Sequence, residues 1–302
     1  MNIRTVLGDI PAEQMGKSYT HEHLICSAYP VNKDPLLGFE DAEERIQDLK
    51  YFKNAGGGTL VEGTCIDFGR NPEKMRTISK EADVHVIATT GYYTHEYHPD
   101  VVETASVEEL ADIFIKEIRS GMDDTKIRAG QIKCAVSLMG IHKKEEKCLR
   151  AAAVVSKKTN APIWIHHGGI MGMKILDILE EETVESEKIV LGHMDRNPDP
   201  NEYMRIAERG VYLSVDNLAR VKRYPIGENL KVLRDLFDGG YMDHVLISAD
   251  LARPIYFQSY GGYGYEFILK EFIPRMQEEL KISKTEMEQI FVKNPQKVYG
   301  CF

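Results

Sequence analysis

Two histidines stand one residue apart in the segment YTHEHLIC, residues 19–26, near the start of the chain. If this segment is a strand, side chains two positions apart point to the same face, so His21 and His23 lie side by side. Neutral imidazoles are common ligands of zinc and other first-row divalent metals. The pair indicates either part of a metal site or two neighbouring surface histidines, and the choice depends on what the rest of the chain places beside them.

Four more side chains with metal chemistry lie in or at the ends of apolar runs: Lys133, His166, His193 and Asp250. Each alone has a structural explanation, since a lone histidine is often only hydrogen-bonded and an aspartate often caps a helix. Lys133 is harder to explain, because the run QIKCAV places an ammonium inside an apolar strand, where uncompensated burial is costly. If Lys133 reacts with carbon dioxide, the resulting carbamate carries a negative charge and two oxygens that can bridge two cations.

The apolar runs that must position these residues number eight, with amphipathic stretches between them. The runs span residues 19–26, 58–65, 84–93, 128–136, 161–169, 188–195, 210–217 and 244–250. Strand and helix alternating eight times predicts an α/β fold of the (β/α)8 TIM barrel type, whose site lies at the carboxyl ends of the strands. A doubly wound sheet is the alternative, but Gly56-Gly57-Gly58 precedes its strand and is not placed as a phosphate-binding loop. The segment 263–302 is predicted to be helical and to close the barrel.

Composition excludes several classes of protein. The 302 residues contain no linker or repeat, so we expect one domain over residues 1–302. A net charge of −9 without a basic block argues against nucleic acid. No apolar run is long enough to span a membrane and the amino terminus lacks the apolar core of a secretory signal, so a cytoplasmic protein is expected. Five cysteines without a CxxC pair indicate reduced thiols.

The ordered set of candidate ligands resembles the phosphotriesterase-like branch of the amidohydrolase superfamily. The matching segments extend through almost the whole chain: THEHL (20–24), TGYY (90–93), IK (132–133), IHHGG (165–169), GHMD (192–195), SADLAR (248–253) and NPQKV (294–298). The resemblance implies two divalent ions, most simply zinc with manganese or cobalt as alternatives, and at the level of the family a homodimer.

The resemblance also assigns a role to each ligand. It implies that His21, His23 and Asp250 hold the more buried ion, that His166 and His193 hold the more exposed ion, and that carbamylated Lys133 bridges the two. His167 is the competing ligand on the fifth strand, but strand alternation and the IHHGG match favour His166.

The implied reaction is hydrolysis by a hydroxide that bridges the two ions, because the cations lower the pKa of the water they share. Asp250 would accept the proton and deliver it to the leaving alkoxide. Tyr93 would orient the substrate carbonyl, unless its ring only packs under the third loop. His95 and His98 are interpreted as substrate-side or surface groups rather than ligands.

Basic residues in the seventh and eighth loops indicate the substrate. Residues 216–227 and 250–267 contain Arg220, Lys222, Arg223 and Arg253, and Arg196 follows the GHMD segment. Cations at the mouth of an otherwise acidic protein suit a small anionic molecule, although Lys222 and Arg223 could be solvated loop charges. We therefore predict a lactonase that opens phosphorylated sugar (aldono) lactones, with Lys222 and Arg253 binding the phosphate.

Two alternatives to this substrate assignment remain. A broader lactonase or phosphotriesterase, acting on acyl-homoserine lactones or organophosphates, would use the same metal ligands. A non-catalytic metal-binding barrel belongs to a different class, which the coordination positions left open for water disfavour.

Overall fold

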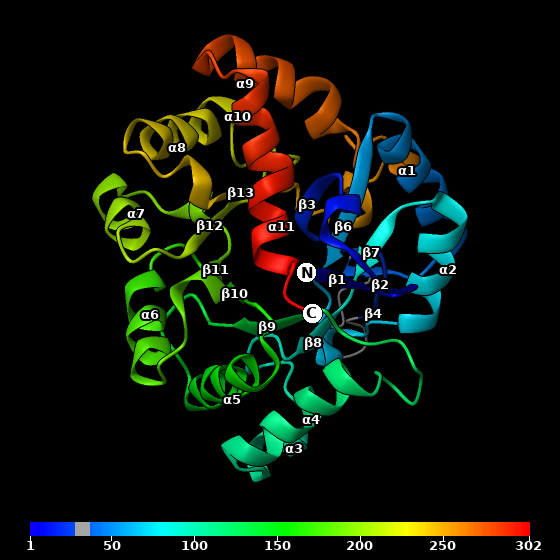
Figure 1. Cartoon of the computed structure of the whole chain (residues 1–302), viewed down its shortest axis with the longest axis vertical. Coiled ribbons are helices and arrows are strands. Elements are labelled where there is room, and N and C mark those ends of the chain that lie inside the picture. The colour runs from blue at the N-terminus through cyan, green and yellow to red at the C-terminus, as the bar shows by residue number, and fades with distance from the viewer. Residues whose placement is uncertain (28–36) are drawn as a thin grey trace.

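The computed structural model describes residues 1–27 and 37–302, and its parallel strands form a ring enclosed by helices (Figure 1). In ring order the strands are β3 Lys17–Glu22, β6 Gly57–Glu62, β7 His85–Ile87 with β8 Thr89–Gly91, β9 Gln131–Ala135, β10 Ile163–His166, β11 Ile189–Leu191, β12 Tyr212–Val215 and β13 Val245–Ile247. β7 and β8 together occupy the third position, since β7 pairs with β6 and β8 pairs with β9. The predicted (β/α)8 barrel is confirmed.

The ring closes between its first and last strands through a side chain. The Ser248 hydroxyl oxygen, just after β13, accepts hydrogen bonds from the backbone N–H groups of Thr20 at 2.7 Å and His21 at 2.9 Å. This contact joins residues more than 220 positions apart in the chain. It holds the carboxyl end of β3, which carries His21 and His23, beside the segment that carries Asp250.

Helices surround the ring. They are α1 Ala42–Asn54, α2 Pro72–Ala82, α3 Asp100–Thr104, α4 Val107–Arg119, α5 Lys143–Thr159, α6 Gly172–Glu181, α7 Pro200–Ala207 and α8 Ile226–Asp238. Local sequence sets several boundaries: Asp41 and Asn71 cap α1 and α2, and Ser106 with Glu109 forms a capping box at α4. The predicted closing segment is helical from Phe267, through α9 Ile273–Leu280, α10 Lys284–Glu288 and α11 Asn294–Tyr299.

The amino-terminal end of the barrel is sealed. The hairpin of β1 Asn2–Thr5 and β2 Gly8–Pro11 lies there with α11, and both termini lie close together (Figure 1). Asn2 and Phe302 exchange two backbone hydrogen bonds of 3.0 Å. Ile3 and Tyr299 pack with residues inside the barrel, among them the fully buried Trp164. The barrel interior is therefore reached from its carboxyl end.

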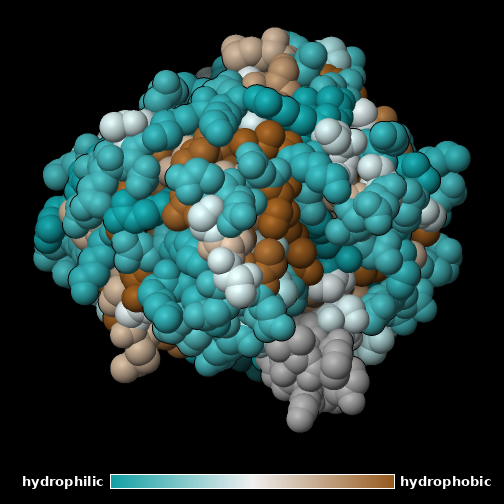
Figure 2. Space-filling model, turned by 90° about the horizontal axis from the view of Figure 1, so that it is seen from below, coloured by the Kyte–Doolittle hydropathy of each residue, from teal (hydrophilic) through white to brown (hydrophobic). Residues whose placement is uncertain are grey.

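The surface on the side of α3, α4 and α5 is mostly hydrophilic, with a narrow apolar strip near its centre (Figure 2). Within the described residues, none of the helices has the length and apolar character needed to cross a membrane. The five cysteines, all within the described residues, form no disulfide.

Candidate metal centre

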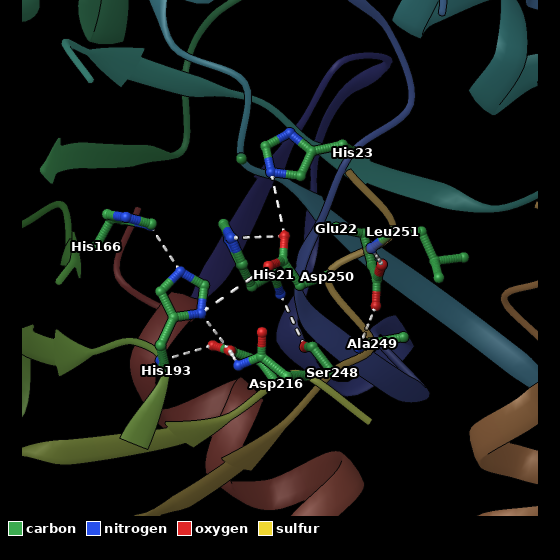
Figure 3. A network of polar contacts seen from close by, with 12 residues as sticks. His21, Glu22, His23, His166, His193, Asp216, Ser248, Ala249, Asp250 and Leu251 are labelled. Carbon is green, nitrogen blue, oxygen red and sulfur yellow. Dashed lines mark hydrogen bonds and ion pairs between the residues drawn. The ribbon is translucent and has the colours of Figure 1, made fainter. Parts of the chain in front are cut away.

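Three of the predicted ligands converge at the junction of the first and last strands (Figure 3). The Nε2 atoms of His21 and His23 each lie 3.5 Å from Oδ1 of Asp250. Two donors bound to one tetrahedral zinc ion at ~2.1 Å would be separated by roughly 3.4 Å. His21, Asp250 and also His193 offer ligand atoms that lie within 4.8 Å of one another. The donor spacing therefore fits a single divalent ion.

His166 and His193 form a second pair. Nε2 of His193 lies 2.7 Å from Nδ1 of His166, and the Tyr93 hydroxyl lies 3.2 Å from Nε2 of His166. On the other side of the His193 ring, Nδ1 lies 2.5 Å from Oδ1 of Asp216. Burial raises the pKa of Asp216 to about 7; in its ionised form this carboxylate can only accept, so the contact then keeps the proton on Nδ1 and leaves the Nε2 lone pair available to a metal.

A second set of contacts orients the first-strand histidines. Nδ1 of His23 lies 2.8 Å from the Thr64 hydroxyl, which donates to Glu62 at 2.6 Å. The His21 ring stacks on Trp164, with centroids 3.7 Å apart and planes 13° apart. Within the described residues, the buried Nδ1 of His21 has no hydrogen-bond partner. Both rings are thus fixed by contacts that leave Nε2 facing Asp250.

Lys133 is 2% exposed and lies between the rings of Trp164 and Tyr93. Its Nζ donates a 2.7 Å hydrogen bond to the carbonyl oxygen of Gly63. Among residues 1–27 and 37–302, no carboxylate forms an ion pair with this ammonium. A Cβ atom at Gly63 would lie 2.6 Å from the His21 ring and 3.3 Å from Nζ, so glycine is needed for this approach. Burial without a counter-charge is the setting in which conversion to a carbamate would relieve the cost.

Electrostatics keep the histidines suitable as ligands. Burial, followed by the charge of Lys133, holds the pKa of His21 well below its usual range. Burial likewise lowers the pKa of His166 and His193. Although burial acts in the opposite direction, Arg220 holds the pKa of Asp250 well below its ordinary value. Neutral imidazoles around an ionised carboxylate are a donor set suited to zinc, manganese or cobalt.

The structure separates His166 from His167. His166 lines the cavity above the ligands, whereas His167 is fully buried and its Nδ1 accepts a hydrogen bond from Gly169 N at 3.0 Å. The alternation of β10 therefore places His166 toward the site. Of the two third-loop histidines, His95 lines the cavity. His98 instead donates a 2.7 Å hydrogen bond from Nε2 to the carbonyl oxygen of Tyr93.

The cavity has a volume of about 950 Å³ and opens at the carboxyl ends of the strands. Arg196, Arg223 and Arg253, all predicted to meet the substrate, line it together with Arg220. Lys222, also predicted to bind the phosphate, has an exposed side chain that lies outside the cavity lining. Within a loop, no regular periodicity tells which of two neighbouring cations faces inward.

From the sequence, Asp216 had no assigned role and Arg220 was named only as one of the basic residues near the mouth, but both contact the predicted ligands. Arg220 forms an ion pair with the Asp250 carboxylate and donates to the Asp250 carbonyl at 2.9 Å. Arg196 lies 3.4 Å from the same carboxylate. Asp216 is the first polar residue after the last apolar residue of the run 210–217, so the rule that found the other ligands also points to it.

Known proteins share this architecture over the whole chain. The model of the Phosphotriesterase family matches residues 1–299. An N-acetyltaurine hydrolase from Danio rerio is 30% identical, covering 98% of this chain and 97% of that protein. The phosphotriesterase homology protein of Escherichia coli is 29% identical, covering 93% of this chain and 96% of that protein.

Solved structures agree with these matches. The crystal structure of a lactonase from Listeria monocytogenes has a TM-score of 0.95 and 31% identity, covering 100% of both chains. That of the Escherichia coli phosphotriesterase homology protein, with phosphate in its active site, has a TM-score of 0.92 and 28% identity, covering 95% of this chain and 99% of that chain. The chain described here is therefore a hydrolase that belongs to the phosphotriesterase family.

Proposed function

We propose that this hydrolase opens phosphorylated sugar lactones and depends on two divalent metal ions. The observation that carries the choice of an anionic substrate is the charge of the cavity, which is opposite to that of the chain. Among the described residues, two carboxylates line it, Glu96 and Asp250, against four guanidinium groups. These belong to Arg196, Arg220, Arg223 and Arg253, whereas Lys133, which also lines the cavity, would be anionic once carbamylated. The whole chain, in contrast, has a net charge of −9.

In this proposal His21, His23 and Asp250 would hold one ion, His166 and His193 would hold the other, and Lys133, once carbamylated, would supply a ligand to them. Zinc is the first candidate, with manganese and cobalt as alternatives. When bound, such ions activate water for attack near neutral pH and polarise the bond to be broken.

The protein side chains bind and orient the substrate, and they carry a proton from the attacking water to the leaving oxygen. Asp250, ionised and in contact with both first-strand histidines, is placed to accept a proton and return it to the leaving alkoxide. Burial raises the pKa of Tyr93, so its hydroxyl stays protonated and can donate to the substrate carbonyl oxygen. Arg253 and Arg223 bind the phosphate, while Arg196 and Arg220, already engaged with Asp250, hold that carboxylate in place.

A second candidate is hydrolysis of an amide that carries an anion. It is favoured by the match to N-acetyltaurine hydrolases, since N-acetyltaurine has a sulfonate that arginines bind as they bind phosphate. The Listeria lactonase and the phosphate bound to the Escherichia coli protein support the lactone phosphate.

A substrate comparison tests the proposal. Purified, metal-loaded protein is assayed against aldonolactone phosphates, the same lactones without phosphate, acyl-homoserine lactones, an organophosphate triester and N-acetyltaurine. We expect the highest kcat/KM for a lactone phosphate. Equal or better turnover of the uncharged lactones would overturn the proposal, and preference for N-acetyltaurine would establish the second candidate.

A further inference from the structure

A second polar cluster lies on the cavity wall, separate from the metal ligands. His95 follows β8 in the third loop and Ser137 follows β9 in the fourth, and both line the cavity. Between them lies the carboxylate of Glu145, which is 0% exposed. Nδ1 of His95 lies 2.9 Å from Oε1 of Glu145, and the Ser137 hydroxyl donates to the same oxygen at 2.5 Å.

Helix capping accounts for the hydrogen bonds of only one of the two oxygens of this carboxylate. Oε2 of Glu145 accepts from the backbone N–H groups of His142 at 2.9 Å and Ser137 at 3.1 Å, which anchors the first turn of α5. Oε1 accepts from the Ser137 hydroxyl and from the His95 backbone and ring. One oxygen therefore serves the helix and the other serves the cavity wall.

The His95 ring is fixed in position and in tautomer. The His142 ring stacks on it, with centroids 4.1 Å apart and planes 13° apart. Because the Glu145 carboxylate can only accept, Nδ1 of His95 carries a proton and Nε2 is the nitrogen left for another partner. In the described part of the chain no group hydrogen-bonds to this Nε2, and the side chain of His95 is 32% exposed.

His95 lies across the barrel from the arginines. The third and fourth strands are four positions away from the seventh and eighth in the ring of eight, and those later strands lead to Arg220, Arg223 and Arg253. Around His95 the wall contains the polar residues Thr94, Glu96 and Ser137 as well as the apolar Leu138 and Met139. A nitrogen held in a fixed orientation in this wall gives directional recognition of one polar group.

We propose that His95, oriented by Glu145, forms a hydrogen bond with a hydroxyl of the substrate at the end remote from its anionic group. This inference rests on the proposed function and makes it more specific. The arginines select the anion and His95 selects a polyhydroxy carbon chain over a deoxy or aliphatic one. His95 is thus a specificity-determining residue.

The test compares a lactone phosphate with its deoxy analogues, each lacking one hydroxyl, in the full-length metal-loaded protein. The variants are His95→Phe, His95→Gln, Glu145→Gln and, as a matched control at the amino end of β7, His85→Gln. For the fully hydroxylated lactone we expect His95→Phe to lower kcat/KM about tenfold, the effect of a lost hydrogen bond. For one deoxy analogue the loss should be under about twofold, because that hydrogen bond is absent already.

The quantity compared is the ratio of kcat/KM for the fully hydroxylated lactone to kcat/KM for the deoxy analogue. Both values are measured on the same preparation of a variant, so the ratio does not depend on how much of that variant is folded. His95→Gln should recover part of the ratio, Glu145→Gln should lower it, and His85→Gln should leave it unchanged. Equal losses on every substrate in His95→Phe would show a merely structural role and overturn the inference. If the unaltered protein turned over no lactone phosphate, the proposed function itself would fail, and this inference with it.

Discussion

Nε2 of His193 and Nδ1 of His166 lie 2.7 Å apart, although 27 positions separate the residues in the chain. Asp216 holds a proton on the far side of His193, so His193 Nε2 is the acceptor and His166 donates from Nδ1. Nε2 of His166 then accepts from the Tyr93 hydroxyl. For both nitrogens to bind one ion, the His166 proton would have to move from Nδ1 to Nε2, and the two nitrogens would have to separate from 2.7 Å to roughly 3.4 Å.

The Asp216→Asn variant should lower the affinity of this site for its ion by about 10- to 100-fold, because the amide no longer enforces the Nδ1–H tautomer of His193. Chelator competition followed by elemental analysis measures the loss. We expect the ion held by His21, His23 and Asp250 to be retained. Two equally tight ions in the variant would show that the His193–Asp216 contact does not tune the site.

Lys133→Ala should lose both metal and activity, since the variant has no group that can become a bridging carbamate. Short-chain carboxylates added at high concentration should restore part of each by occupying the space of the missing carbamate. Metal content is read by elemental analysis in parallel with turnover. Unchanged metal content in the variant would contradict the bridging role.

The alternation of strands and helices predicted the barrel. The polar residues at the strand ends predicted the site, because the carboxyl ends of parallel strands meet at one mouth whatever lies between them in sequence. The residues that support the ligands follow no such rule. The pairing of β3 with β6 brings Thr64 to His23 and Glu62 to Thr64, and Trp164 stacks on His21 across the barrel interior. The direction of Lys222 could not be predicted for a related reason, since side-chain direction in a loop depends on tertiary contacts.

Arg253→Gln should reduce kcat/KM for a lactone phosphate by roughly 10- to 100-fold, the effect expected on losing a charge-assisted hydrogen bond. The loss should be mainly in KM and should shrink for the same lactone without phosphate. Lys222→Gln is the matched comparison, because its side chain is exposed outside the cavity lining. An effect from Lys222 as large as that from Arg253 would support the pair of phosphate ligands predicted from the sequence.

Glu145 makes the free energy of unfolding depend on pH in the acidic range. Although burial acts in the opposite direction, hydrogen bonds from Ser137, His142 and His95 lower its pKa below the ordinary value of 4.5. A carboxylate with a lowered folded-state pKa contributes stability above its unfolded pKa and loses it as pH falls through the folded value. Glu145→Gln should therefore destabilise the protein by about 1–3 kcal/mol at pH 7 and by less near pH 3. Urea denaturation at both pH values measures this, and an equal loss at each would contradict the assignment.

Ser248 couples barrel closure to the metal site, and its removal should affect both. Ser248→Ala deletes the acceptor for two buried backbone N–H groups, those of Thr20 and His21, at a cost of about 1–3 kcal/mol for a group left unsatisfied. Because His21 and Asp250 flank this contact, the variant should also bind the first ion more weakly than the second. Ser79→Ala is the matched control, since Ser79 is an equally buried serine on α2, where its hydroxyl donates to the Val84 carbonyl away from the site. Urea denaturation of the metal-free proteins separates the fold effect, and metal titration separates the site effect. A Ser248 variant with full metal affinity and lowered stability would show that strand closure and ligand placement are independent.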